Sequence, residues 1–463
     1  MSDLKQKYLG DRAFRQMVLR IAVPVMVQNG ITNFVSLLDN IMVGQVGTEP
    51  MSGVAIVNQL LFVYSLCIFG GLAGAGIFTA QFYGQEDHEG IRQTFRYKLL
   101  TGLLLTAATF AVLLAAGEPL ISLYLNESAE GGDLVSTLRF GQSYLRIMLA
   151  GLPAFMLAQV YSSTLRECGE TLLPMRAGIA AVLVNLVGNW LLIYGHLGLP
   201  ALGVDGAAIA TVISRYVEMA IVMAWTHRHR GRNPWVVGLY RSLHIPAERV
   251  RQFFVKGFPL LVNEALWSSG MATLTQCYSM RGLSVVTAQN ISSTISNLFN
   301  VVFLSMGTAI SIIVGQRLGA NRLKEARDLA RKLIVFSILM STGTALLLVC
   351  AAPFFPRFYQ TGEDIRALAT QLMIVNAVFM PMNAFTNACY FTLRSGGKTW
   401  ITFLFDSACL WAISIPIAFI LSRYTDMYIV WMVVCVLSSD LLKCALGFHL
   451  VRKGVWVKNI VGK

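Results

Sequence analysis

Five acidic residues lie inside long apolar stretches of the sequence, namely Asp39, Glu218, Glu264, Asp406 and Asp440. A charged side chain near the centre of a bilayer costs roughly 2.5–3.5 kcal/mol on insertion scales, so each of them requires a partner or a function. Glu218 follows Arg215 by three residues and Asp440 precedes Lys443 by three, so each can pair with a base on its own helix face. We interpret these two acids as structural.

The other three acids are candidates for binding cations. Asp39 and Asp406 have no local base, and Lys256 lies about two helical turns from Glu264, near the predicted inner surface. A carboxylate without a permanent counter-charge in a low dielectric attracts a proton, a sodium ion or an organic cation, but holds only one of them at a time. Mutual exclusion of this kind is the simplest physical basis for antiport, in which an inward-driven ion displaces an outward-bound substrate.

Glu264 has the most distinctive sequence surroundings of the three. It follows Pro259 by five residues, stands beside Asn263 and precedes Trp267. A proline inside a helix removes a backbone hydrogen bond and can bend the helix, which is useful where a helix must move. Aromatic and methionine side chains are frequent in the chain and could provide adaptable apolar and cation–π walls for a cavity.

The composition indicates a membrane protein. Of the 463 residues, only 13% are charged and 55% are hydrophobic, whereas soluble domains carry roughly 25% charged residues. The mean hydropathy is +0.61. These values exclude a soluble multidomain enzyme and a disordered chain, and eight cysteines without a CxxC pair argue against a disulfide scaffold or a zinc site.

The elements that must position these residues are membrane-spanning helices. A spanning helix needs about 20 mostly apolar residues. Because the apolar residues continue around every face, helices are favoured over barrel strands, and we predict an all-α integral membrane protein with twelve spans. These spans are predicted at 21–43, 53–83, 99–119, 140–163, 177–196, 203–225, 257–280, 286–315, 333–355, 367–392, 401–422 and 428–450.

The distribution of basic residues predicts the orientation. With both termini cytoplasmic, 29 of the 37 Lys and Arg residues fall in inner segments and five in outer segments, as expected if basic loops are retained inside. The net charge of +13 is therefore explained by topology. It does not require a nucleic-acid partner, and the basic run at 226–232 is interpreted as a cytoplasmic loop facing anionic lipid headgroups.

An internal repeat divides the chain into two halves. With an offset of 235 residues Pro24 matches Pro259, and a Q-x-x-G motif at Gln81 matches one at Gln316. With an offset of 228 a Leu-Arg-x-x-Gly motif ending at Gly169 matches one ending at Gly397. We predict two pseudo-symmetric six-helix lobes at 1–225 and 257–463, joined by a basic cytoplasmic linker at 226–256. Two parallel lobes suit alternating access, in which a central cavity opens to each side in turn.

The motifs together resemble the multidrug and toxic compound extrusion (MATE) transporters. The residues that carry the resemblance are the segment Leu38-Asp39-Asn40-Ile41-Met42-Val43-Gly44, the paired Q-x-x-G and Leu-Arg-x-x-Gly motifs, and the segment from Gly203 to Thr211. The similarity covers essentially the whole chain. It implies a V-shaped pair of lobes that expels cationic, often lipophilic compounds in exchange for sodium ions or protons.

The resemblance also implies a cation site in the amino lobe. The first-helix aspartate of the family is matched by Asp39, and its polar partners on helices 5 and 6 are matched by Asn185, Asn189 and Thr211. These four residues form the candidate sodium site. Some members have an acid where Asn189 stands, so this chain has one carboxylate fewer. Hydrogen bonding between helices is the alternative role for the two asparagines.

For the carboxyl lobe, the resemblance implies a substrate site around Glu264, which matches a seventh-helix glutamate of one branch of the family. That branch often has a tenth-helix aspartate at the position of Asn383, so Asp406 is the remaining candidate for a second acid. The expected cation-coupling residues are Asp39, Asn185, Asn189, Thr211, Glu264 and Asp406. The expected substrate-binding residues are Asn263, Glu264, Trp267, Asn383 and Asp406.

We therefore expect a cation-coupled multidrug exporter, monomeric, in the cytoplasmic membrane, with cationic small molecules and the bilayer as its partners. No cofactor is expected beyond sodium or protons as the coupling ion. A lipid-linked glycan flippase is the alternative in transport, although it would want several cationic side chains in its cavity. An enzyme is disfavoured because no histidine lies deep in a span and HExxH, GxSxG and P-loop motifs are absent from the sequence.

Overall fold

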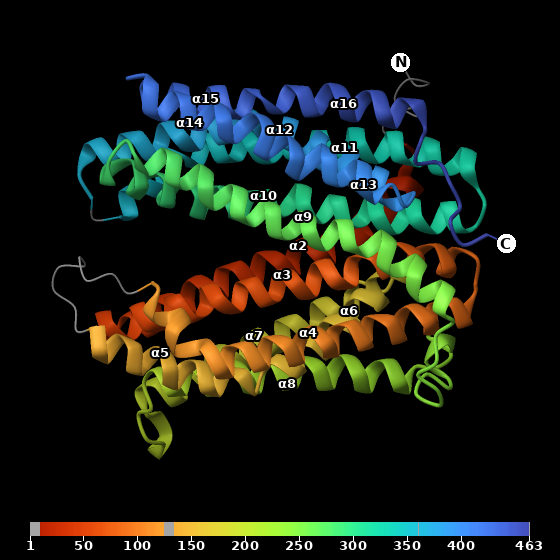
Figure 1. Ribbon diagram of the computed structural model, residues 1–463, viewed down its shortest axis with the longest axis horizontal. Coiled ribbons are helices and arrows are strands. Elements are labelled where there is room, and N and C mark those ends of the chain that lie inside the picture. The colour runs from red at the N-terminus through yellow and green to blue at the C-terminus, as the bar shows by residue number, and fades with distance from the viewer. Residues whose placement is uncertain (1–9, 125–133, 360, 463) are drawn as a thin grey trace. The chain divides into compact units, whose positions relative to one another are not determined.

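The computed structural model describes residues 10–124, 134–359 and 361–462, and these residues form helices without a strand (Figure 1). The first half contains α2 (Arg12–Gly44), α3 (Thr48–Gly84), α4 (His88–Ser122), α5 (Leu134–Leu149), α6 (Leu152–Glu167), α7 (Leu172–Tyr194) and α8 (Val204–Arg228). The second half contains α9 (Ala247–Ser279), α10 (Leu283–Gly319), α11 (Leu323–Ala351), α12 (Glu363–Ser395), α13 (Thr399–Phe403), α14 (Ile415–Tyr424), α15 (Ile429–Ser438) and α16 (Asp440–Lys453). Short 3₁₀ turns are η1 (His196–Gly198), η2 (Pro234–Val236) and η3 (Phe355–Phe358).

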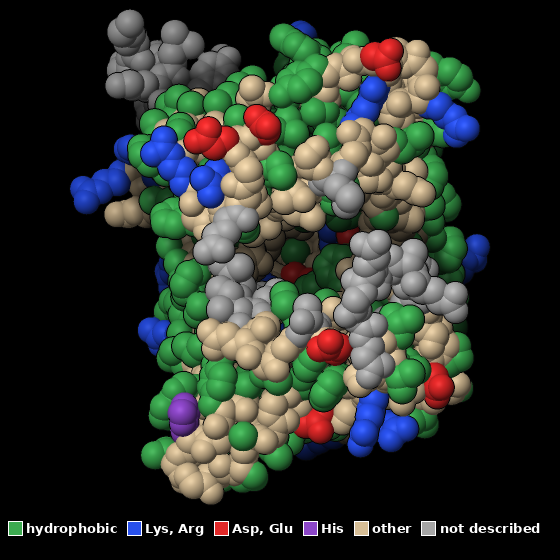
Figure 2. All heavy atoms as spheres, turned by 90° about the vertical axis from the view of Figure 1, so that its left-hand side faces the viewer, with side chains coloured by type: hydrophobic (Ala, Val, Ile, Leu, Met, Phe, Trp, Pro, Cys, Tyr) green, Lys and Arg blue, Asp and Glu red, His purple; other side chains and the backbone are tan. Residues whose placement is uncertain are grey.

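The helices confirm the predicted all-α membrane fold. Among the described residues, ten helical segments are long and apolar enough to cross a membrane, and the pair α5 and α6 adds an eleventh. This set does not include α9, the predicted seventh span, which contains Asn263 and Glu264. Viewed end-on, the molecule shows hydrophobic side chains along the flanks of the helices, with charged side chains scattered over the end that faces the viewer (Figure 2). Exposed apolar flanks of this kind are suited to contact with lipid.

Three of the predicted spans are interrupted helices, and the twelfth is divided at Ser439 between α15 and α16. The fourth is broken between α5 and α6, which meet at 49°. Gly151 precedes α6, and Pro153 occupies the first turn of α6. Proline lacks a backbone N–H, which is tolerated in the first turn of a helix but disrupts the interior of one. The eleventh span contains two π-helical segments, η4 (Leu404–Ala408) and η5 (Leu410–Ser414). Such segments are rare and frequently occur at functional sites, and η4 contains Asp406.

The chain divides into two compact units. Unit 1 comprises the described residues up to Met26, the segment Ala80–Asp87 and the residues from Val255 onward. Unit 2 comprises Val27–Thr79 and His88–Phe254. In unit 1, α10 packs against α11 and α12, and in unit 2, α8 packs against α5, α6 and α7. The units differ from the predicted lobes because part of α2 and the carboxyl-terminal end of α3 belong to the same unit as the carboxyl half.

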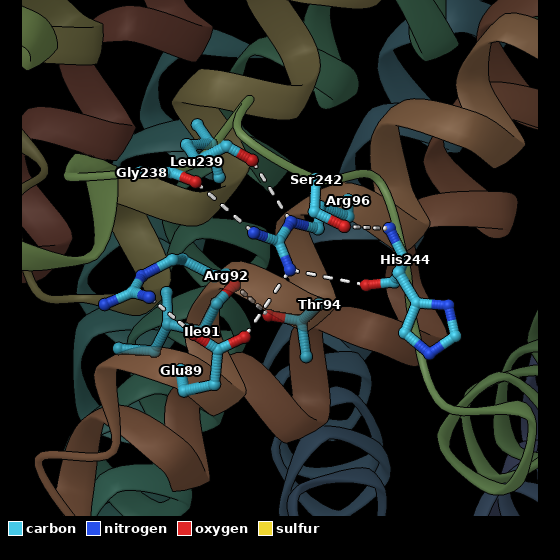
Figure 3. Close-up of polar contacts among 9 residues, drawn as sticks. All are labelled: Glu89, Ile91, Arg92, Thr94, Arg96, Gly238, Leu239, Ser242 and His244. Carbon is cyan, nitrogen blue, oxygen red and sulfur yellow. Dashed lines mark hydrogen bonds and ion pairs between the residues drawn. The ribbon is translucent and has the colours of Figure 1, made fainter.

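The predicted linker is folded onto unit 2 between α8 and α9. Trp235 is buried and its ring lies 5.5 Å from that of Phe95. The guanidinium of Arg96 on α4 donates to the backbone oxygens of Leu239 at 3.1 Å, Gly238 at 3.4 Å and His244 at 3.3 Å (Figure 3). Because one buried cation satisfies three carbonyls, this part of the linker is a fixed cap on α4 and not an extended loop.

The two Q-x-x-G motifs contact each other within unit 1. A β-carbon at Gly84 would lie 2.0 Å from the backbone oxygen of Gln316, and one at Gly319 would lie 1.9 Å from that of Gln81. Glycine is therefore required where the two helix ends cross. The Gln81 side chain is fully buried, donates to the Ser395 oxygen at 2.9 Å and accepts from the Ile460 amide at 2.9 Å. The repeated motif thus joins two helix ends and the carboxyl-terminal segment.

We predict that Gly319→Ala destabilises the protein, because its methyl group would collide with a backbone carbonyl that no side-chain rotation can move. Overpacking of this kind costs about 1–3 kcal/mol. The matched control is Gly343→Ala on α11, where a β-carbon meets nothing within 4 Å and a gain of up to about 1 kcal/mol is expected. Thermal unfolding of the purified protein measures both changes. Equal stability of the two variants would contradict this role for the crossing.

Candidate functional site

In unit 2, four of the predicted residues meet at one place, the Asp39 site. Asp39 lies on α2, Asn185 and Asn189 lie one turn apart on α7, and Thr211 lies on α8. The amide nitrogen of Asn189 donates to Asp39 Oδ1 at 2.6 Å. Asn185 and Asn189 are 5% and 1% exposed. The structure therefore brings together all four residues that the sequence placed in the candidate sodium site.

The Asn185 amide can present either end to the carboxyl group. With its nitrogen turned toward Asp39, it donates to Oδ1 at 2.9 Å and Oδ2 at 3.0 Å, and its oxygen accepts from the Thr211 hydroxyl at 3.1 Å. With the amide reversed, its nitrogen donates to Thr211 at 3.1 Å and its oxygen faces the carboxyl. The first orientation suits an ionised carboxylate, and the second suits a protonated carboxyl or a bound cation between the two oxygens.

A further oxygen at this site lacks a hydrogen-bond donor in the part of the chain that the structure describes. Asn189 Oδ1 is buried and has no partner among the described residues. A buried polar atom without a partner costs about 1–3 kcal/mol, so its position next to a carboxylate is informative. It is an oxygen ligand of the type that hard cations prefer.

A basic residue that is distant from Asp39 in the sequence also acts on it in the structure. Arg215 on α8 attracts Asp39 electrostatically, but its ion pair is with Glu218 at 3.5 Å, which confirms the predicted pairing. The Arg215 guanidinium also lies 5.1 Å from the centre of the Phe155 ring. Arg215 thus lowers the cost of a negative charge at this depth without forming an ion pair with Asp39.

A small cavity in unit 2 adjoins this site. Its volume is about 60 Å³, and its lining includes Thr211, Arg215, Tyr64 and Phe155. One water occupies about 30 Å³ in the liquid, so the cavity has room for a water or a small ion but not for a drug-sized compound.

In unit 1, three predicted residues form a second cluster, the Glu264–Asp406 site. Asn263 on α9 is 2% exposed and donates to Asp406 Oδ2 at 3.0 Å. Ser407 of η4 in turn donates to Asn263 Oδ1 at 2.7 Å and to its backbone oxygen at 3.0 Å. Glu264 follows Asn263 directly on α9, and its carboxyl group and that of Asp406 repel each other electrostatically. The sequence did not indicate the role of Ser407.

Bases act on these acids across helices. Arg394 on α12 attracts Glu264, and Lys443 on α16 attracts Asp406. Asp406 has no base nearby in the sequence, as stated above, but Lys443 from a distant helix acts on it while keeping its predicted ion pair with Asp440 at 3.0 Å. None of the ion pairs formed by the described residues includes Asp39, Glu264 or Asp406.

Two other predicted substrate-binding residues are not linked to this cluster. Trp267 lies on α9 three residues after Glu264 and is 39% exposed. Asn383 lies half-buried on α12. The hydrogen bonds of the described residues include none between either side chain and the two acids. Their role in binding a substrate stays a prediction.

The internal repeat explains where the second site arose. Gln28 on α2 corresponds to Asn263 by the offset of 235, and Gly178 on α7 corresponds to Asp406 by the offset of 228. A β-carbon at Gly178 would lie 3.1 Å from Gln28 Nε2, so this pair is in contact in unit 2 as Asn263 and Asp406 are in unit 1. The repeat offsets, applied to polar residues, could have predicted that Asn263 and Asp406 meet.

In a helical membrane protein, carboxyl groups held by neutral amides within apolar helices commonly mark a pathway for ions or substrates. The family model MatE matches residues 24–191 and 259–420, which is more than half of the chain. The chain belongs to the MatE family, which consists of membrane transporters.

The chain is similar over nearly its whole length to curated and solved proteins. It is 21% identical to the probable multidrug resistance protein NorM of Thermotoga maritima, over 96% of this chain and 94% of that protein. It is 24% identical to the multidrug resistance protein NorM of Photobacterium profundum, over 97% and 92%. The solved structure of a mutant of the Vibrio cholerae MATE transporter VcmN matches with a TM-score of 0.85 at 18% identity, over 96% and 98% of the two chains.

We predict that the hydrogen bond between Asn263 and Asp406 contributes about 1.5–3 kcal/mol, as expected for a bond to a charged group. The measurement is a double-mutant cycle with Asn263→Ala and Asp406→Ala, followed by thermal unfolding. The control cycle removes the neutral pair of Asn376 and Ser292, which are joined at 3.1 Å, and a coupling of about 0.5–1.5 kcal/mol is expected there. Additive effects of Asn263→Ala and Asp406→Ala would show that Asp406 is neutral or otherwise solvated.

Proposed function

We propose that this protein exports cationic, lipophilic compounds from the cytoplasm by antiport with sodium ions or protons. The observation that carries the proposal is the Asp39 site, where a carboxyl group at membrane depth is contacted by the amides of Asn189 and Asn185 and not by a paired base. The multidrug resistance proteins named among the relatives support the substrate class. The protein is accordingly a transporter of the cell membrane.

The Asp39 site is proposed to bind the coupling ion. For a sodium ion, the Asp39 carboxylate and the oxygens of Asn185 and Asn189 supply hard ligands once the Asn185 amide turns its oxygen toward the site, where its nitrogen can donate to Thr211. For a proton, the same orientation lets the protonated carboxyl donate to Asn185. Rotation of one amide therefore adapts the site to a loaded and an empty state.

The Glu264–Asp406 site is proposed to bind the organic cation. Two neighbouring carboxyl groups favour a single positive guest, because adding one cation relieves their mutual repulsion. The exposed indole of Trp267 offers a cation–π surface within one turn of Glu264, and Asn383 on α12 is proposed as a polar wall. Attraction by Arg394 and Lys443 weakens the negative potential enough for the guest to leave again.

The flippase alternative is not favoured by this arrangement. A pyrophosphate-linked lipid would need several cationic side chains facing a cavity. Of the bases within the predicted spans, Arg215 and Lys443 are paired with Glu218 and Asp440. The clusters at membrane depth are instead acidic and amide-rich, which suits a positive guest.

We predict that Asp39→Asn and Glu264→Gln each lower the initial rate of cationic dye efflux from everted vesicles at least tenfold. A tenfold loss corresponds to about 1.4 kcal/mol, less than a charge-assisted contact contributes. The matched controls are Asp426→Asn and Glu118→Gln, which make the same changes at exposed positions and should export normally. Export at the wild-type rate by both test variants, at equal amounts in the membrane, would show that the assigned roles are wrong.

We further predict that one ion gradient, imposed alone, drives export in proteoliposomes, and that Asp39→Asn abolishes the response to that gradient. Asn189→Ala should raise the half-saturating concentration of the same ion about tenfold, because it removes one contact to the carboxyl group. Collapse of the gradient with an ionophore is the control. Export that proceeds without either gradient would contradict antiport.

A further inference from the structure

The amino-terminal part of α11 extends beyond the hydrocarbon layer. The helix has 29 residues and is about 43 Å long, whereas the hydrocarbon core is roughly 30 Å thick. Its continuous apolar run begins at Leu333. The turns before Leu333 therefore lie in the headgroup layer, on the side predicted to be cytoplasmic.

Three cations of these turns line one cavity in unit 1. The cavity has a volume of about 440 Å³, and its walls include Lys324, Arg327 and Arg331 of α11 together with Gly454 and Val457 of the carboxyl-terminal segment. The three cations are spaced by three and four residues, so they share a helix face. All three are exposed at the rim of a hollow large enough for a phosphate ester.

The acidic residues of this segment are already paired. Asp328, which also lines the cavity, forms an ion pair with Lys332 at 2.6 Å. Glu325 pairs with Arg317 and Arg322, each at 3.8 Å. None of the ion pairs of the described residues includes Lys324, Arg327 or Arg331, so the cavity has a net positive charge that an anion would neutralise.

The far wall of the cavity is fixed. Gly454 has φ +73°, and a β-carbon there would lie 2.3 Å from Arg327 Nη2, so this glycine leaves room for the guanidinium. The segment that follows is anchored by Trp456, which is fully buried, and by Asn459, which donates to the Gly319 oxygen at 3.1 Å. Arg327 is therefore positioned before any ligand arrives.

We propose that this cavity binds the phosphate group of an anionic phospholipid of the cytoplasmic leaflet. Guanidinium groups recognise phosphate oxygens through paired hydrogen bonds, and basic pockets on the cytoplasmic side of membrane proteins suit anionic headgroups. The location of Arg327 and Arg331 in the headgroup layer favours a lipid over a soluble phosphate. The proposal does not depend on the transport function.

The test is native mass spectrometry of the purified full chain in detergent, titrated with phosphatidylglycerol, phosphatidylcholine or inorganic phosphate. Saturable binding of phosphatidylglycerol is expected, with at least tenfold weaker binding of phosphatidylcholine. Arg327→Gln combined with Arg331→Gln should weaken the phosphatidylglycerol affinity at least tenfold. The control is Arg139→Gln combined with Arg357→Gln, which removes the same charge from exposed positions in the predicted outer segments and should bind normally.

Two further measurements test whether the bound phosphate group belongs to a lipid or to a soluble compound, and whether the position of Arg327 matters for binding. Competition by millimolar inorganic phosphate would support the phosphate site but assign it to a soluble phosphate compound, and lack of competition would assign it to lipid. Gly454→Ala keeps every charge but displaces Arg327, so it should also weaken binding in protein that elutes normally on size exclusion. Equal binding by the Arg327/Arg331 variant and the wild type, or an equal loss in the Arg139/Arg357 control, would overturn the proposal.

Discussion

A carboxyl group at membrane depth must be solvated by the protein itself, and the packing around Asp39 and Asp406 follows from this constraint. Amides donate hydrogen bonds without cancelling the negative charge, so Asn189 and Asn263 stabilise an acid that still attracts a cation. A paired arginine would stabilise the acid more but would leave nothing for a guest to neutralise. The nearest bases act at longer range and keep their own acidic partners.

The repeat shows how one framework acquired two different sites. At equivalent positions, unit 2 has a glutamine packed on Gly178 and unit 1 has an asparagine bonded to Asp406. The glycine allows a close helix contact, whereas the aspartate lies in the π-helical segment η4. A π-helical turn is wider than an α-helical turn and leaves room for an additional polar side chain. The presence of an aspartate instead of a glycine at this position is therefore consistent with the π-helical geometry of η4.

The sequence predicted the helices well because bilayer thickness fixes their length, and it predicted the Asp39 site through a resemblance that matched four residues one by one. It did not predict the features that depend on contacts between distant segments. The break before α6, the cap that Arg96 forms over the folded linker and the attraction of Lys443 to Asp406 are of this kind. Of these, only the break has a local signal, which is the glycine and proline at Gly151 and Pro153.

The two acidic sites differ in a way that fits the guests proposed for them. At the Asp39 site a single carboxyl group is closely surrounded by buried amides, and the adjoining cavity has room for little more than a water. Tight oxygen-rich surroundings favour a small ion, because the hydration shell it loses must be replaced at short range. At the second site the carboxyl groups of Glu264 and Asp406 interact, and the exposed Trp267 follows Glu264 by one turn on α9, so the attraction is spread over a larger surface. A bulky cation needs that spread, since its charge is delocalised and most of its binding energy comes from apolar contact.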